Sequence, residues 1–261
     1  MCKKIKLKKL NILVFIILII CIVSFVYNLI KIISWNRNNK ETTKIIDKIN
    51  NTVEVQKEVS TVQDDAINSQ VNHDFNLLKD TNNQTIAWLK VNGTDIDYPV
   101  VQSKDNSYYL NHSFDKTYND AGWIFLDYRN DINNLGKNNI IYGHARLDKT
   151  MFGSLKNTLK KSWFEDRNNH IINLYTENET MTFEIFSVYH IKTENYYITT
   201  DFTSSEFATF INTLKDRSIY NFENEVTLTD KILTLSTCYK TDQKLVVHAK
   251  LIKKETSDSS F

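Results

Sequence analysis

A cysteine and a histidine follow two apolar, β-prone segments, and together they have the chemistry for acyl transfer. Residues 232–237 lead to Cys238, and residues 139–142 lead to His144. A cysteine thiolate attacks carbonyl carbon readily, and an imidazole can protonate a departing amine. A side chain at a strand end can reach the rim of a barrel while its backbone stays rigid. The pair therefore indicates a cysteine-dependent acyl-transfer site.

Each of these two residues also has an ordinary structural interpretation. A lone cysteine at a strand end is commonly a small buried hydrophobic residue. The chain contains six histidines, so a histidine by itself indicates little. We expect His248, within the apolar run 245–249, to be an outward-facing strand residue without a role in the site. Residue types alone leave both interpretations of Cys238 and His144 open.

The N-terminal residues predict a membrane anchor. Five lysines lie within residues 1–9, and residues 10–30 carry no charge. About 20 apolar residues suffice to cross the hydrocarbon core as a helix. A cleaved signal peptide would have a shorter apolar region followed by an A-x-A-like pattern of small residues, and residues 32–36 offer no such pattern. We therefore predict a basic cytoplasmic tail over residues 1–9, an uncleaved single-pass anchor over residues 10–30, and export of the remaining chain.

Cysteine placement and net charge limit the chemistry of the exported part. Cys2 and Cys21 lie in the predicted tail and anchor, so Cys238 is the only exported cysteine. A single thiol cannot form an internal disulfide, which leaves an inert buried thiol or a reactive one. The formal net charge of +1 gives no reason to expect a nucleic-acid partner. Without a cluster of residues at metal-ligand spacing, we expect no metal and no cofactor.

The remaining sequence predicts a stalk, one folded domain and a tail. Residues 31–72 are polar with a thin apolar stripe, which indicates a partly helical stalk. Residues 73–254 contain a short predicted helix at 75–78, many short apolar runs and a helical pattern at 205–218, which favours a mostly-β domain: a closed antiparallel barrel with helical insertions. Residues 255–261 are expected to be disordered. The runs are 85–91, 96–102, 122–126, 139–142, 170–175, 181–189, 226–228, 232–235 and 245–252.

Several motifs resemble those of one enzyme family. Residues 234–238, Thr-Leu-Ser-Thr-Cys, resemble the TLxTC signature of sortases in the form common in class B. Residues 141–144, Ile-Tyr-Gly-His, are similar to the strand-ending histidine motif of that family. Residues 97–102, 108–110 and 124–130 resemble early class B segments. The resemblance runs from about Phe75 to Lys253, and the motifs occur in the family's order.

The order of the two reactive residues separates this family from papain-like peptidases. In those enzymes the nucleophile precedes the histidine. Here His144 precedes Cys238 by 94 residues, and the helical pattern at 205–218 lies between them. An extra helix in that position is a known feature of class B sortases. Pilus-polymerising sortases usually add a second membrane segment at the C-terminus, which residues 253–261 do not provide.

The resemblance implies a sortase-type transpeptidase of a Gram-positive cell surface. Its barrel would lie outside the cell membrane, with the N-terminus in the cytoplasm. Cys238 would cleave an NPxT- or LPxT-like sorting signal of an exported surface protein after threonine, forming a thioester. His144 would protonate the departing amine and then accept a proton from a peptidoglycan precursor amine. The expected partners are thus sorting signals, that amine and the membrane, and no nucleic acid.

The resemblance also implies positions that contact the sorting signal. Leu110 and Ile198 have an alternative interpretation as core residues, and Tyr142 as an ordinary strand aromatic. Arg129 lies in a family motif, but we expect it to form a structural ion pair. The implied substrate-binding residues are Asn106, Leu110, Tyr142, Thr193, Tyr197, Ile198 and Ser236.

One departure from the family pattern concerns the strand after the cysteine. The family has an arginine there, and this chain has Lys244. Only residues 239–243 separate Cys238 from Lys244, a length typical of a hairpin that pairs the two strands antiparallel. Directly opposite residues have Cβ atoms about 4.5–5.5 Å apart, so the ammonium could reach the sulfur. We predict Lys244 as the third catalytic residue, the alternative being a solvent-facing lysine at a sheet edge.

Two other functions remain open at this stage. The missing arginine is compatible with a relative that binds sorting signals without turning them over, because lysine lacks the planar forked donors of arginine. A surface cysteine peptidase that passes the acyl group to water would use the same cysteine and histidine.

Overall fold

An apolar helix forms the N-terminal part of the chain. The computed structural model describes residues 2–60 and 74–256, and in it α1 spans Cys2–Ser60. Within α1, the stretch Ile12–Asn50 contains an 18-residue window with a mean hydropathy of 3.0, and the helix is long and apolar enough to cross a membrane. The predicted anchor lies in this helix, and the predicted stalk is helical as far as Ser60. Residues 61–72 of that stalk lie outside the described residues.

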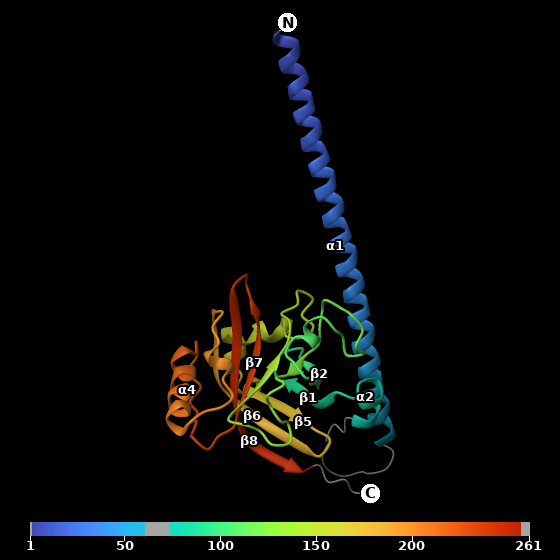
Figure 1. Ribbon diagram of the computed structural model, residues 1–261. Coiled ribbons are helices and arrows are strands. Elements are labelled where there is room, and N and C mark those ends of the chain that lie inside the picture. Colours follow the sequence, from blue (N-terminus) through green and yellow to red (C-terminus); the bar gives the residue numbers. More distant parts are fainter. Residues whose placement is uncertain (1, 61–73, 257–261) are drawn as a thin grey trace. The chain divides into compact units, whose positions relative to one another are not determined.

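The chain divides into two units, one ending at Lys44 and one beginning at Ile45. The strands of the second unit form a closed barrel in the order β1-β2-β3-β4-β7-β8-β6-β5 (Figure 1). This confirms the predicted mostly-β barrel with helical insertions. The strands of the described chain are β1 (Thr85–Val91), β2 (Asp97–Val101), β3 (Phe125–Leu126), β4 (Asn138–Tyr142), β5 (Ile171–Tyr175), β6 (Glu179–Lys192), β7 (Ile232–Tyr239) and β8 (Gln243–Thr256).

The sequence predicted an entirely antiparallel barrel, and this is wrong for two pairs of neighbouring strands. β2 pairs with β3 and β4 pairs with β7 in parallel, and the other neighbours are antiparallel. Parallel neighbours require a crossover of a dozen residues or more. Both connections are long enough, because the chain leaves β2 at Val101 and enters β3 at Phe125, and it leaves β4 at Tyr142 and enters β7 at Ile232. The second crossover contains β5, β6 and α4 (Ser204–Arg217), the longest described helix that lies wholly within the second unit.

Alternation along the strands separates the barrel core from an outer face. Leu233 and Leu235 of β7 belong to the buried core of the barrel. Successive side chains of a strand point to opposite faces. Thr234, Ser236 and Cys238 therefore lie on the outside of the barrel. Cys238 is thus held on a strand whose other face is fixed by core packing.

The helix α4 covers part of this outer face. A capping box between Thr203 and Glu206 begins the helix by satisfying free backbone N–H groups. Its apolar side includes Phe207 and Phe210, which pack in a second buried cluster together with Val246 of β8. Figure 1 shows α4 alongside the barrel strands. The sequence placed this helix within one residue at each end.

Shorter helical segments lie mostly before and between the strands. The tight turn η1 contains Leu110, one of the implied substrate-binding residues, and η4 contains two more, Tyr197 and Ile198. The segments are α2 (Phe75–Thr81), η1 (Tyr108–Leu110), η2 (Gly153–Leu159), α3 (Lys161–Glu165), η3 (Arg167–His170) and η4 (Tyr196–Ile198).

Three expectations about the domain need correction. Residues 226–228 form no strand, because Thr227 N–H donates to the Asp230 carboxylate and the chain turns there. β8 continues through Glu255 and Thr256, which pair with β6, so the domain runs past the predicted boundary at 254. His248 lies on the outer face as expected, yet it is fully buried because α4 covers that face. The rest of the predicted tail, 257–261, lies outside the described residues.

The residues of α1 that belong to the second unit contribute to its stability. Ile49 is buried in the barrel core cluster, and Ile45 and Ile46 pack against that cluster. Burying one isoleucine stabilises a fold by about 1.5–3 kcal/mol. We predict that a chain beginning at residue 40 has a Tm about 5–10 °C above that of a chain beginning at residue 52. Circular-dichroism melting of the two soluble chains measures this, and equal Tm values would contradict it.

Candidate active site

The register of β4 against β7 brings Cys238 and His144 to one end of the barrel. Their parallel pairing runs to Tyr142 opposite Ser236. Two residues further along each chain segment come His144 and Cys238, so both lie at the same end of the barrel. Neighbouring strands are about 4.8 Å apart. The two residues that sequence reasoning paired are therefore neighbours at the barrel rim.

Gly143 holds the chain close to β7 beyond the end of β4. Its N–H donates to the Ser236 carbonyl at 3.3 Å, and the Thr237 hydroxyl donates to the Gly143 carbonyl at 2.7 Å. A Cβ atom at Gly143 would lie 2.9 Å from side-chain carbons of both Ile124 and Phe152. The residue before His144 must therefore be small, and the two hydrogen bonds extend the strand alignment toward His144.

Lys244 lies opposite Cys238, as the hairpin length predicts. The two residues are directly paired across the antiparallel β7–β8 hairpin, and Lys244 Nζ lies 3.2 Å from Cys238 Sγ. Tyr239 and Gln243 also pair, so the loop is shorter than expected and turns at Lys240, whose φ is 56°. The Lys244 side chain thus bends over the sulfur and does not extend into solvent. Positive charge beside a sulfur stabilises negative charge on it.

The imidazole of His144 is held by a backbone carbonyl. Its Nε2 lies 2.7 Å from the Leu110 carbonyl oxygen. A carbonyl only accepts hydrogen bonds, so Nε2 carries a proton and Nδ1 is the nitrogen left for proton exchange. The Leu110 side chain is half exposed, at 44%. Leu110 thus has a structural function through its backbone that the sequence did not reveal.

Gly122 lies beneath the contact between His144 and Leu110. Its φ is +59°, and an added Cβ atom would lie 2.5 Å from the Tyr109 carbonyl oxygen. The same atom would be 2.9 Å from His144 Cδ2 and 2.9 Å from the Leu110 carbonyl oxygen. Glycine tolerates this conformation and this close approach, and other residues do not. Sequence reasoning took Gly122 only as the start of a strand and missed it.

Asp127 is a second residue that sequence reasoning missed. Its buried carboxylate accepts hydrogen bonds from Asn106 Nδ2 at 2.9 Å and from the Tyr142 hydroxyl at 2.9 Å. Arg129 completes the cluster with a two-point ion pair to Asp127, as expected for a structural arginine. Burial alone would raise the pKa of Asp127, but hydrogen bonds from Arg129 and Tyr142 outweigh it and lower that pKa. Asp127 therefore stays charged and holds two of the implied substrate-binding residues.

The segment 196–199 joins these residues from the other side. Arg129 Nη2 donates to the Ile198 carbonyl at 2.9 Å, and the Tyr197 hydroxyl lies 3.3 Å from Ser236 Oγ. Tyr197 and Ser236 are almost fully buried, at 3% and 4% exposed. Thr193 instead bonds to the Asp242 carbonyl in the β7–β8 loop.

The seven implied substrate-binding residues thus form one group of six, linked by hydrogen bonds, and one separate residue. Six of them bond to the Asp127–Arg129 pair, to one another or to His144, and Thr193 lies by the hairpin loop. Their contact with a sorting signal stays a prediction.

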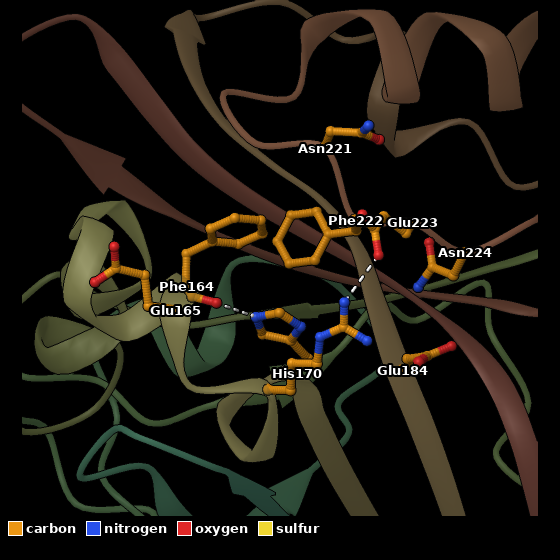
Figure 2. A pocket seen from close by; sticks show the side chains of 9 residues that line it. Phe164, Glu165, His170, Glu184, Asn221, Phe222, Glu223 and Asn224 are labelled. Atoms are coloured by element: carbon orange, nitrogen blue, oxygen red, sulfur yellow. Dashed lines mark hydrogen bonds and ion pairs between the residues drawn. The ribbon is translucent and has the colours of Figure 1, made fainter.

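A separate pocket of about 350 Å³ lies elsewhere on the barrel (Figure 2). It contains the stacked rings of Phe164 and His170, and Glu184 lines it as well. Glu184 of β6 lies opposite Lys250 of β8, and Lys250 lies opposite Ile232, the first residue of β7. Cys238 lies near the other end of β7. That separation is roughly 20 Å at about 3.3 Å per residue. The pocket is therefore not part of the cysteine site.

Comparisons with known proteins agree on one family. Residues 89–252 match the family described as "Sortase domain". The chain is similar to sortase B of Staphylococcus aureus, with 38% identity over 184 residues, 69% of this chain and 75% of that protein. Among solved structures, a Staphylococcus aureus sortase B–substrate complex superposes with a TM-score of 0.70 at 33% identity, covering 82% of this chain and 99% of that one. A sortase B complexed with triglycine gives 0.69 at 34% identity, covering 84% and 98%.

The glycine contact generates a prediction about His144. Gly122→Ala should lower turnover of a substrate peptide about 10²-fold, because displacing a catalytic group by about 1 Å costs that much. Gly136→Ala is the matched control, since its added Cβ atom would meet only Asn139 Oδ1 at 3.9 Å. Steady-state kinetics and melting curves on both variants provide the measurement. Parental turnover by Gly122→Ala would show that the His144–Leu110 contact is not needed.

The Lys244 contact generates a second prediction. Lys244→Ala should lower turnover about 10²-fold, the effect of losing one oxyanion donor. It should also slow alkylation of Cys238 by iodoacetamide, because the positive charge beside the sulfur is lost. Lys244→Arg should keep both rates within a few-fold of the parental protein.

Lys240→Ala serves as the control for charge in the same hairpin. The Lys240 ammonium lies over the Tyr239 ring, 5.3 Å from its centre, whereas the Lys244 ammonium lies 3.2 Å from the sulfur. Lys240→Ala should therefore leave both rates close to parental. An equal loss in Lys240→Ala and Lys244→Ala would mean that overall hairpin charge matters and the contact with the sulfur does not.

Proposed function

The chain belongs to the sortase family, as a class B member and a cysteine transpeptidase, and from that premise we propose its reaction. The enzyme cleaves an NPxT- or LPxT-like sorting signal after threonine and transfers the new acyl end to a peptidoglycan amine. The observation that carries this proposal is the Lys244 ammonium 3.2 Å from Cys238 Sγ, at the rim that also holds His144. A nucleophile, a cation and an acid/base group at one barrel edge are the parts that acyl transfer requires.

In the first half-reaction, Cys238 Sγ attacks the threonine carbonyl as a thiolate. A carbon–sulfur bond forms, and the carbonyl oxygen takes negative charge that the Lys244 ammonium stabilises. The peptide carbon–nitrogen bond then breaks, and His144 gives a proton to the departing amine. The product is a thioester between the sorting signal and Cys238.

In the second half-reaction, an amine nitrogen attacks the thioester carbonyl. A new peptide bond forms, the carbon–sulfur bond breaks, and the sulfur leaves as a thiolate. His144 accepts the proton that the attacking amine loses, which restores the starting state. Each proton that leaves the imidazole in the first half returns in the second.

The proposed partners follow from the chemistry of the site and from the relatives. One solved relative is a substrate complex and another is a complex with triglycine, a peptide with a free amine. For this chain we propose a sorting-signal peptide as acyl donor and a primary amine of a peptidoglycan precursor as acceptor. The groove residues Asn106, Tyr142 and Ile198, grouped around Asp127 and Arg129, are the proposed peptide contacts.

The proposed location is the outer surface of the cell membrane. Residues 1–9 would remain in the cytoplasm, residues 10–30 would span the membrane once, and residues 31–72 would link the anchor to the catalytic domain. The support is the apolar part of α1 together with the lysines that precede it.

One experiment separates transpeptidation from the other functions. The soluble chain from residue 40 is mixed with a fluorogenic sorting peptide, with and without triglycine, and the products are identified by mass. Ligated product supports the proposal. Hydrolysis alone, with or without the amine, would show a peptidase, and peptide binding without product would show a binding-only relative.

The reactive residues generate the matching prediction. Cys238→Ala should form no acyl-enzyme, and His144→Ala should lose about 10²–10⁴-fold in turnover or more. His190→Ala is the control, because His190 is an exposed strand histidine whose ring lies 4.9 Å from the Tyr239 ring at an angle of 35°. Mass spectrometry of trapped acyl-enzyme and circular dichroism check both variants. Product from folded Cys238→Ala at the parental rate would overturn the mechanism.

A further inference from the structure

A histidine is buried beneath the helix that covers the outer face of the barrel. His248 is 0% exposed and has the rings of Phe186, Tyr189 and Phe210 around it. Burial lowers its pKa to about 3, so the imidazole is neutral. A buried polar ring costs free energy unless both nitrogens are hydrogen-bonded. The proposed reaction makes no use of this residue.

Both nitrogens of His248 take part in a continuous chain of hydrogen bonds. Its Nε2 lies 2.9 Å from the Tyr189 hydroxyl, which lies 2.6 Å from the Tyr196 hydroxyl. Its Nδ1 lies 2.8 Å from Thr234 Oγ1, which lies 2.6 Å from Asn138 Oδ1. We define these five side chains, Tyr196, Tyr189, His248, Thr234 and Asn138, as the His248 chain.

Only one direction of donation satisfies the His248 chain. Asn138 Oδ1 can only accept, so the Thr234 hydroxyl donates to it and must accept from His248 Nδ1–H. A neutral imidazole carries one proton, so Nε2 accepts from Tyr189. The Tyr189 oxygen then accepts from Tyr196. The chain therefore has a fixed polarity that runs from Tyr196 to Asn138.

Both ends of the His248 chain meet the same short segment, residues 196–199. Asn138 Nδ2 donates to the carbonyls of Tyr197 at 3.0 Å and Thr199 at 2.9 Å. At the other end, Tyr196 is itself a residue of that segment, with the Arg217 guanidinium 4.4 Å over its ring. Residues 196–199 are thus held through a side chain at one end and through two carbonyls at the other.

The segment 196–199 borders the proposed peptide groove. The Ile198 carbonyl accepts from Arg129, and the Tyr197 hydroxyl meets Ser236 Oγ, two residues before Cys238. We propose that His248 is a positioning residue that fixes residues 196–199 as a wall of the sorting-peptide groove. It governs peptide affinity without touching peptide or sulfur. This inference rests on the proposed function, because it assigns that groove to the sorting peptide.

A histidine suits this place because it accepts on one side and donates on the other. Leucine would fill much of the volume but would leave the Tyr189 proton without its acceptor. Glutamine carries both an amide N–H and a carbonyl oxygen, so it can reproduce the polarity in part. Tyr189→Phe keeps the ring and removes only the hydroxyl between Tyr196 and His248. These three substitutions separate the effect of breaking the hydrogen bonds of the His248 chain from the effect of losing side-chain packing.

Kinetics of the soluble chain with a sorting peptide and triglycine test the proposal. His248→Leu and Tyr189→Phe should raise KM for the peptide about tenfold, the size of one lost hydrogen bond that orders a binding segment. The value of kcat and the rate of Cys238 alkylation by iodoacetamide should change less than about twofold. His248→Gln should recover part of the lost affinity.

Ser187→Ala is the matched control for a lost buried hydrogen bond. The Ser187 hydroxyl donates to the Leu214 carbonyl at 2.6 Å and so holds α4 to β6, without reaching residues 196–199. It should leave KM unchanged. Hydrogen exchange at the amides of residues 196–199 should quicken in His248→Leu and Tyr189→Phe and stay parental in Ser187→Ala.

These readouts distinguish failure of the inference from failure of the proposed function. If the parental chain turns over no sorting peptide, the proposed function fails, and exchange at residues 196–199 still decides whether His248 holds the segment. An unchanged KM in folded His248→Leu would overturn the inference. The inference would also be overturned if kcat and the alkylation rate of Cys238 fell together in His248→Leu. A rise in KM in Ser187→Ala equal to that in His248→Leu would overturn it as well.

Discussion

The parallel pairing of β4 with β7 is the constraint on which the site depends. It aligns Tyr142 with Ser236 and so carries His144 and Cys238 to one end of the barrel. The antiparallel β7–β8 hairpin adds Lys244 directly opposite Cys238. Because side chains alternate along a strand, a shift of one residue in the register of β7 would turn Cys238 toward the core. Core packing of the alternate residues therefore fixes the chemistry as well as the fold.

The same outer face contains two polar systems of different kinds. Near the rim, the charged pair Asp127–Arg129 holds Tyr142 and the Ile198 carbonyl. Deeper under α4, the neutral His248 chain holds the same segment from its other side. A buried charge needs a partner and several donors, which Arg129 supplies, whereas a neutral chain only needs each donor to meet an acceptor. Residues 196–199, the proposed groove wall, are thus held by an internally neutralised pair and by uncharged groups, and the Lys244 ammonium is the charge that lies beside the sulfur.

Much of this arrangement could be predicted from the sequence because the signals were local. The reactive pair follows strand-like runs, the hairpin length set Lys244 opposite Cys238, and the pattern at 205–218 gave α4. The parallel pairings, by contrast, depend on a crossover of many residues that no local pattern encodes. The burial of His248 and the hydrogen bonds of Asp127 arise from segments far away in the chain. Gly122 was missed because its close contacts are with His144 and the Tyr109 and Leu110 carbonyls, which only the folded chain brings together.

The exchange of arginine for lysine fits the hairpin that carries it. A guanidinium makes planar, two-point contacts, whereas an ammonium is a compact point charge on a flexible stem. Across a directly opposed pair the lysine stem can fold over the sulfur, and its ammonium reaches 3.2 Å from Sγ. In the proposed reaction, this charge would stabilise first the thiolate and then the carbonyl oxygen. A compact charge on a flexible stem suits that role, whereas the planar donors of Arg129 and Asn138 hold the carbonyls of Ile198 and Tyr197 in the segment that we propose as the wall of the peptide groove.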